Sequence, residues 1–207
     1  MATAPILLVE DIPNILDFLS MTLRFKGYEV ITARNGQEAW EILQQLRPAL
    51  LITDILMPRM DGFALVYRLR SDPQLRSIPV IFLSATYITP EDQAFAMRLG
   101  AARFIEKPVD IEELLLTIAE LIQQGPPPPP EPLEERLFYE NYRERLENKL
   151  RQKNQQIART ERILANIPAE QKPAFEELLH QAISDRDEVE RELNKVNQIL
   201  EGFSRLS

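Results

Sequence analysis

Carboxylate, hydroxyl and amine side chains stand directly after the apolar segments in the first half of the sequence. They are Glu10, Asp11, Asp54, Ser84 and Lys107. Three carboxylates held close together repel one another, so such a cluster needs a cation to stay ionised, and oxygen ligands of this kind suit Mg²⁺. Lys107 supplies one positive charge, which cannot balance three carboxylates. The residue types predict a magnesium site if the fold brings them together, and solvated loop charges if it does not.

Short apolar segments alternate with amphipathic stretches up to about residue 124. The segments PILLVE, YEVIT, ALLIT, PVIFLS and RFIE have the β-branched and aromatic residues of strands that are buried on both faces. Five stretches between them are long enough for helices: 13–26, 36–46, 62–70, 89–99 and 110–124. Five strand–helix repeats predict an α/β fold, a (βα)5 doubly wound parallel sheet. Ligands bind such a sheet beyond the carboxyl ends of its strands, where the five polar residues stand.

Residues 125–131 interrupt this pattern with one glycine and five consecutive prolines. We expect an extended spacer of about 15 Å there; a proline-rich ligand for an SH3-like domain is the alternative. In residues 132–207, apolar residues recur every seven positions, and a break with two prolines divides the segment into two stretches. This pattern predicts an all-α antiparallel coiled-coil hairpin. The expected units are therefore a domain at 1–124, a linker at 125–131 and a helical hairpin at 132–207.

The composition excludes several classes of function. Without cysteine there is no thiol catalysis and no cysteine-ligated zinc or iron–sulfur site. The net charge of −8 disfavours a nucleic-acid partner, and both halves are acidic, with 11 Lys and Arg against 16 Asp and Glu in 1–125 and 13 against 16 in 126–207. The apolar runs are far shorter than the ~20 residues of a membrane-spanning helix, and the start of the sequence lacks signal-peptide features. We expect no membrane partner and a cytoplasmic location.

A run around Asp54 and three pairs at other strand ends together carry a family resemblance. They are TDILMPRMDG, Glu10-Asp11, Ser84-Ala85 and Lys107-Pro108. With these motifs, the segment of about residues 4–124 resembles the receiver domain of two-component response regulators. The resemblance implies a flavodoxin-like fold. It also implies transfer of a phosphoryl group from a sensor histidine kinase or a phosphotransfer protein to Asp54.

The resemblance assigns metal ligands and catalytic groups. It implies that Mg²⁺ is bound by Asp11, Asp54 and the backbone carbonyl of Leu56, with Glu10 acting through water. Lys107 matches the lysine that pairs with the phosphoryl oxygens. Such a domain catalyses its own phosphorylation and dephosphorylation. Because the Leu56 side chain cannot hydrogen-bond an attacking water, we expect a relatively long-lived phosphoryl state.

Four further positions match residues that shape the site or switch it. Pro108 matches the proline that follows the lysine in a cis peptide, and Ala85 matches a small residue that leaves room for the phosphoryl group. Ser84 and Phe104 match the hydroxyl and the aromatic residue that rearrange on phosphorylation. A plain core aromatic remains the alternative for Phe104.

The second half has no pattern of a DNA-binding helix-turn-helix or winged helix, and no phosphate-binding loop of an output enzyme. We therefore expect residues 132–207 to form a homodimer or to bind a helical protein partner under the control of phosphorylation. The alternative is a phosphorelay intermediate or phosphate sink with a passive dimerisation hairpin, and a constitutive scaffold is third. Arg186 could mark the helix register, but we favour a rim arginine. His180 could be a phosphorylated histidine, but we favour a surface residue.

Overall fold

The computed structural model describes residues 4–84, 90–123, 128 and 131–205. It forms two compact units, Met1–Leu133 and Glu134–Ser207. The proline run at 125–131 lies largely outside the described residues. Within the described ranges, no helix is both long enough and apolar enough to cross a membrane.

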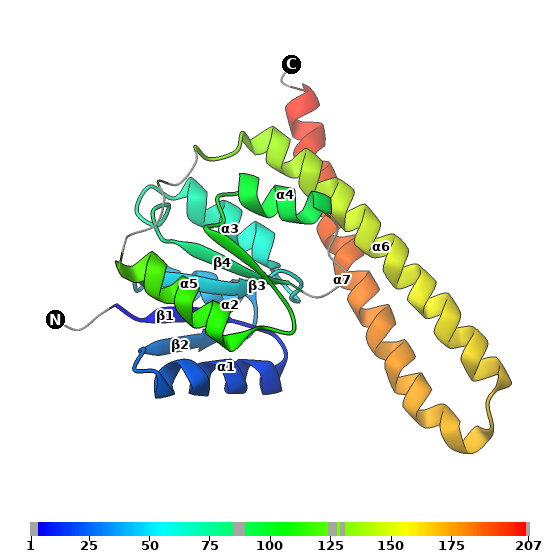
Figure 1. Cartoon of the computed structure of the whole chain (residues 1–207). Helices are drawn as coiled ribbons and strands as arrows, with labels where there is room; N and C mark the ends of the chain where they lie inside the picture. Colours follow the sequence, from blue (N-terminus) through cyan, green and yellow to red (C-terminus); the bar gives the residue numbers. More distant parts are fainter. Residues whose placement is uncertain (1–3, 85–89, 124–127, 129–130, 206–207) are drawn as a thin grey trace. The chain divides into compact units, whose positions relative to one another are not determined.

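The first unit is built on a sheet of five parallel strands (Figure 1). They are β1 (Ile6–Val9), β2 (Val30–Ala33), β3 (Leu50–Asp54), β4 (Val80–Ser84) and β5 (Arg103–Glu106). The strand order is β2-β1-β3-β4-β5. Every residue of β1, β3 and β4 is buried, which explains why these segments are almost continuously apolar. The predicted doubly wound parallel sheet is confirmed, and β1 and β3 lie side by side at its centre.

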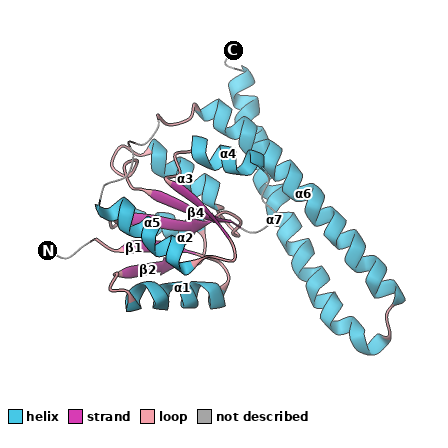
Figure 2. Cartoon of the chain, in the orientation of Figure 1, coloured by secondary structure: helices cyan, strands magenta, loops and turns pink. Residues whose placement is uncertain are grey.

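Helices cover both faces of this sheet (Figure 2). They are α1 (Pro13–Phe25), α2 (Gly36–Leu43), α3 (Gly62–Ser71), α4 (Pro90–Arg98) and α5 (Ile111–Gln123). On one face, buried leucines and isoleucines of α1 and α5 form a cluster with residues of the strands. On the other, the ring of Phe63 in α3 lies 5.3 Å from that of Phe82 in β4 and 5.2 Å from that of Phe95 in α4. The sheet is therefore a rigid platform for the groups at its carboxyl edge.

The ends of α2 illustrate how local chemistry sets an element's limits. Asn35 caps its start, where the side-chain oxygen accepts a hydrogen bond of 2.9 Å from the amide of Glu38. The helix ends at Leu43, three residues before the end predicted from the sequence. Beyond Leu43 the chain forms a turn, in which the amides of Gln45 and Leu46 both donate to the Ile42 carbonyl. Pro48 follows, and a proline disfavours helical backbone in the residue before it.

The second unit is a pair of long helices, α6 (Glu135–Asn166) and α7 (Lys172–Arg205), joined through a short 3₁₀ turn, η1 (Ala169–Gln171). The chain runs out along α6 and back along α7, which pack against each other (Figure 1). Ala182, Val189 and Val196, which follow one another at intervals of seven residues, are buried, as the seven-residue recurrence of apolar residues predicts. The predicted helical hairpin is confirmed.

Two residues singled out in the hairpin sequence lie near its surface. Arg186 is half-buried and bonds Asp187 of its own helix at 2.6 Å, as expected of a rim arginine. His180 is exposed. An ion pair joins the two helices, from Lys153 Nζ to Asp185 Oδ2 at 2.7 Å.

Candidate functional site

The carboxyl edge of the sheet gathers three acidic side chains. Asp54 ends β3, and Glu10 and Asp11 directly follow β1, the neighbouring strand. Each offers a carboxylate oxygen, and these oxygens lie within 4.8 Å of one another. Glu10 and Asp54 are buried and Asp11 is half-buried. The predicted convergence at the strand ends is therefore present.

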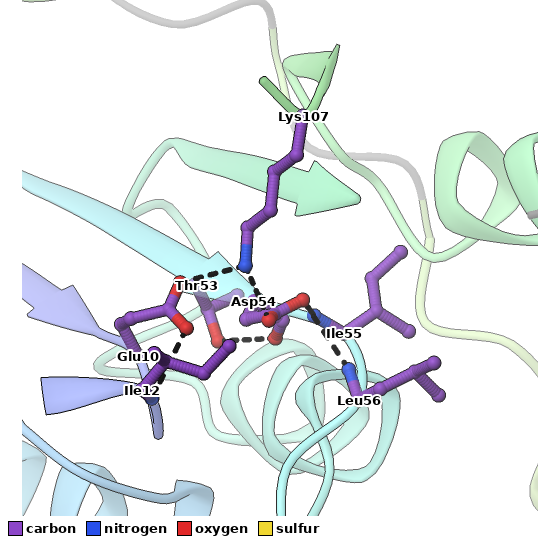
Figure 3. Close-up of polar contacts among 7 residues, drawn as sticks. All are labelled: Glu10, Ile12, Thr53, Asp54, Ile55, Leu56 and Lys107. Atoms are coloured by element: carbon purple, nitrogen blue, oxygen red, sulfur yellow. Dashed lines mark hydrogen bonds and ion pairs between the residues drawn. The ribbon is translucent and has the colours of Figure 1, made fainter. Parts of the chain in front are cut away.

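Lys107 reaches this cluster from the end of β5 (Figure 3). Its Nζ donates to Asp54 Oδ2 at 2.5 Å and to Glu10 Oε2 at 2.7 Å. Its backbone amide bonds the carbonyl of Ser84 at 2.6 Å, which ties the lysine to the end of β4. The peptide bond between Lys107 and Pro108 is cis. One ammonium group thus bridges two buried carboxylates.

Burial and charge act against each other in this bridge. Burial raises the pKa of Glu10 above its usual value, and the hydrogen bond from Lys107 only partly offsets this, while the charge of Asp54 raises the pKa further. For Lys107, burial acts to lower the pKa, but attraction to Asp54 and Glu10 outweighs it and the pKa is raised. The lysine is therefore firmly protonated, and the site still holds more negative than positive charge.

Backbone groups fix the orientation of the Asp54 carboxylate. Its Oδ1 accepts a hydrogen bond of 2.5 Å from the amide of Ile55, and the amide of Leu56 lies 3.4 Å from the same oxygen (Figure 3). The buried hydroxyl of Thr53 donates to the Asp54 carbonyl at 2.8 Å. Neither Thr53 nor Ile55 is recognisable as a site residue from the sequence, because Ile55 acts through its backbone amide and the Thr53 hydroxyl bonds only a backbone carbonyl.

Two glycines support the loop between β3 and α3. Gly62 donates its amide to the Ile55 carbonyl at 2.9 Å, and a Cβ added to Gly62 would lie 2.2 Å from the carbonyl oxygen of Asp54. Gly36, at the start of α2, donates to the Met60 carbonyl at 2.9 Å, and a Cβ there would lie 2.5 Å from that oxygen. Backbone approaches this close exclude a side chain. The pairs Asn-Gly and Asp-Gly at these helix starts were the available sequence signal.

The residues expected to switch lie at the ends of β4 and on β5. Ser84 is buried, and its hydroxyl has no hydrogen-bond partner among the residues that the structure describes. Phe104 is half-buried and pairs in register with Phe82 of β4. Ala85 lies outside the described residues. An unpaired buried hydroxyl costs free energy.

The acidic cluster fits a hard divalent cation. All three side chains offer oxygen ligands, and the two buried carboxylates carry more charge than Lys107 balances. Such all-oxygen sites suit Mg²⁺. The side chain of Leu56 has no atom that can bind a cation. The binding of Mg²⁺ by its backbone carbonyl stays a prediction.

Comparisons with known proteins agree with this geometry. Residues 6–119 match the family model of the response regulator receiver domain. Response regulator Rre1 of Synechocystis sp. is 37% identical over 118 residues, which is 56% of this chain and 51% of Rre1. Protein PilH of Pseudomonas aeruginosa is 36% identical over 115 residues, 56% of this chain and 94% of PilH. This chain therefore spans about half the length of Rre1 but nearly all of PilH.

A solved structure of a receiver domain is also similar to this chain. The signal receiver domain of a signal transduction histidine kinase from Syntrophus aciditrophicus is 39% identical, with a TM-score of 0.55. The match covers 59% of this chain and 92% of that domain.

Proposed function

The chain belongs to the response regulator receiver domain family, and we propose from this premise that Asp54 accepts a phosphoryl group from a sensor histidine kinase or a phosphotransfer protein. One observation carries the proposal: at the carboxyl edge of the sheet, the buried Asp54 carboxylate pairs with Lys107 and lies close to two further carboxylates. An oxygen of Asp54 attacks phosphorus while the P–N bond to the donor histidine breaks and the imidazole leaves. The product is an acyl phosphate.

The surrounding residues bind and orient the reacting groups. The amide of Ile55 holds one carboxylate oxygen of Asp54, and Lys107 Nζ moves from the carboxylate to the oxygens of the phosphoryl group. Asp11, Asp54, Glu10 and the Leu56 carbonyl would hold Mg²⁺. When bound, Mg²⁺ neutralises negative charge on the transferring phosphoryl group. Catalysis is therefore mainly positioning and electrostatics.

A phosphorylated histidine protein provides the test of this acceptor role. The wild-type chain and His180→Gln should both take up label, whereas Asp54→Asn should not. Asp11→Asn should take up label slowly and respond weakly to Mg²⁺. Label on His180 in the Asp54→Asn variant would contradict the proposal.

An exposed apolar stripe on α1 supports a helical phosphodonor. Phe18, Met21 and Phe25 are 55%, 63% and 88% exposed, and their spacing places them on one face of the helix. The helix starts at Pro13, two residues after Asp11, at the edge of the sheet where Asp54 lies. Phe18→Ser should slow transfer from a histidine protein but leave phosphorylation by acetyl phosphate unchanged. Equal slowing with both donors would show that the stripe does not dock the donor.

The buried hydroxyl of Ser84 supports a switching role. Once a phosphoryl group stands on Asp54, the hydroxyl can donate to its oxygen, and the movement of Ser84 leaves space for Phe104. The hairpin then serves as the output module, by homodimerisation or by binding a helical partner without contacting DNA. The second candidate function is a phosphate sink or relay, in which the hairpin associates whatever the state of Asp54.

Beryllofluoride, which mimics the phosphoryl group, separates these two functions. The affinity of self-association or partner binding should change on addition of beryllofluoride with Mg²⁺ in the wild-type chain and not in Asp54→Asn. An unchanged affinity in the wild type would favour the sink. The Asp54→Asn variant controls for effects of the salt alone.

A further inference from the structure

The two helices of the hairpin carry opposite charge. The α6 segment Glu135–Asn166 holds eight Lys and Arg against five Asp and Glu, whereas the α7 segment Lys172–Arg205 holds five against eight. The helices have 32 and 34 residues, so each is about 50 Å long at 1.5 Å per residue. The hairpin thus presents a basic helix beside an acidic helix along its length.

The opposite charges meet around one ion pair. Lys153 Nζ bonds Asp185 Oδ2 at 2.7 Å, and Gln181 donates to the other oxygen at 2.8 Å. Burial acts to raise the pKa of Asp185, but the hydrogen bonds from Lys153 and Gln181 and the charges of Lys153 and Lys149 outweigh it, so the pKa is lowered. This pair therefore marks the level at which Lys153 of α6 faces Asp185 of α7.

Unpaired charges stand next to that pair on the same face. Lys149 lies one turn before Lys153 on α6, and Glu188 lies one turn after Asp185 on α7. Both are half-buried. Neither makes a hydrogen bond or an ion pair with any residue in the described part of the chain. Lys149 contributes only its charge to the environment of Asp185, so within the described residues both Lys149 and Glu188 can still form an ion pair with a second chain.

Apolar side chains are also incompletely covered by the two-helix seam. Two pairs of leucines lie two heptads apart and are only half-buried: Leu150 and Leu164 on α6, and Leu179 and Leu193 on α7. A pair of helices can bury only the apolar side chains that lie between them. Full burial of these leucines requires further helices, as in a four-helix bundle.

We propose that the hairpin binds a second copy of this chain through a charged face made of Lys149, Lys153, Asp185 and Glu188, with α6 of each copy against α7 of the other. A two-fold interface requires a self-complementary surface, and a basic row beside an acidic row at one level provides it. Pairing like helices would instead place like charges together. To bind a different helical protein, the hairpin would need charges of only one sign on this face. The presence of both signs therefore favours a second copy of this chain as the partner.

The proposal names the partner of the hairpin in the output role given above. Only the use of the dimer in signalling rests on that role. Self-association is measured on the unphosphorylated full chain, so a failure to phosphorylate Asp54 leaves the result intact. Raising NaCl from about 0.05 M to about 0.5 M should weaken the dimer, because salt screens charges at an interface rim. Sedimentation equilibrium reports the dissociation constant. A wild-type chain that stays monomeric up to about 100 μM would overturn the proposal.

Charge reversal tests the pairing itself. Lys149→Glu and Glu188→Lys should each weaken self-association at least about tenfold, because each places like charges across both symmetric contacts. An equimolar mixture of the two variants should form a heterodimer of near wild-type affinity, which native mass spectrometry distinguishes by mass. Homodimers of unchanged affinity, or a mixture without a heterodimer, would show that the charged face is not the interface.

Matched controls separate the interface from the stability of the hairpin. Arg159→Glu and Glu190→Lys make the same charge changes on exposed positions off the charged face, and they should leave the dissociation constant unchanged. Circular dichroism reports whether each variant keeps its helices. If a reversal variant loses helix, Lys149→Gln and Glu188→Gln take its place and should weaken the dimer less, but in the same direction. Equal weakening by the control variants would contradict the proposal.

Discussion

Replacing Lys107 with methionine removes a positive charge from between two buried carboxylates. The ammonium group lies 2.5 Å from Asp54 and 2.7 Å from Glu10, whose side chains are 8% and 0% exposed. At an effective dielectric constant of about 20, each contact contributes about 6 kcal/mol of Coulomb attraction. Much of this offsets the cost of burying the charges, so removing the lysine should lower the free energy of unfolding by about 3 kcal/mol in metal-free protein.

The loss should depend on pH. Burial already raises the pKa of Glu10, and without the hydrogen bond from Lys107 the pKa rises further. A carboxyl group whose pKa is higher in the folded than in the unfolded protein destabilises the fold as the pH rises from the unfolded to the folded pKa. The loss in Lys107→Met should therefore be largest near about pH 8 and smaller near about pH 5, where more of Glu10 is protonated. Mg²⁺ should restore stability by supplying positive charge to the folded state.

Urea unfolding at the two pH values, with EDTA or with Mg²⁺, measures these effects. Arg103→Met is the matched control, because Arg103 pairs with Glu120 at 3.6 Å with both side chains more than half exposed. Removing such a surface pair should cost at most about 1 kcal/mol and respond neither to pH in this range nor to Mg²⁺. If Lys107→Met lost the same stability at both pH values and Mg²⁺ restored none of it, the electrostatic account of the site would be refuted.

Three further variants test the loop, the switch and the phosphoryl lifetime. Gly36→Ala should weaken Mg²⁺ binding in a metal titration, because the new Cβ would lie 2.5 Å from the Met60 carbonyl oxygen; Gly202→Ala, where nothing lies within 4 Å, should not. Ser84→Ala should leave the free energy of unfolding within about 1 kcal/mol of wild type yet abolish the beryllofluoride response, since no partner of the hydroxyl is found among the described residues. Leu56→Asn should shorten the acyl-phosphate lifetime at least about tenfold in a phosphate-release assay, because an amide can orient the attacking water. Equal lifetimes would show that the side chain at position 56 does not control hydrolysis.

The strands and their polar ends can be predicted from the sequence because local chemistry determines them. Buried parallel strands need unbroken apolar runs, as in Ile6–Val9 and Val80–Ser84, and the residues that follow must lie at one edge of the sheet. The buried face of α7 can also be predicted, because burial at every seventh residue requires apolar side chains at that spacing in the sequence.

Contacts between distant segments leave no such trace. Arg70, near the end of α3, reads as an exposed helix residue, yet it is buried and donates to the carbonyls of Arg76, Ile78 and Gly100 at 2.7–2.9 Å. Burial lowers its pKa to about 10. Periodicity reports which face of an element is apolar, but not which carbonyl lies across a loop or thirty residues away.

The acidic cluster was predictable as a set, but its internal geometry was not. Lys107 was expected to pair with a phosphoryl group, and in the structure it bridges Asp54 and Glu10. Such a bridge depends on side-chain lengths and on the position of β5 relative to β3, which residue types alone do not determine.

The most direct test of the central claim is to locate the phosphoryl group after incubation of the full chain with acetyl phosphate and Mg²⁺. Intact mass spectrometry followed by peptide mapping should find one phosphoryl group, on Asp54, that is absent in Asp54→Asn and greatly reduced by EDTA. A chain that gains no phosphoryl group while correctly folded, or that carries it on another residue, would contradict the account.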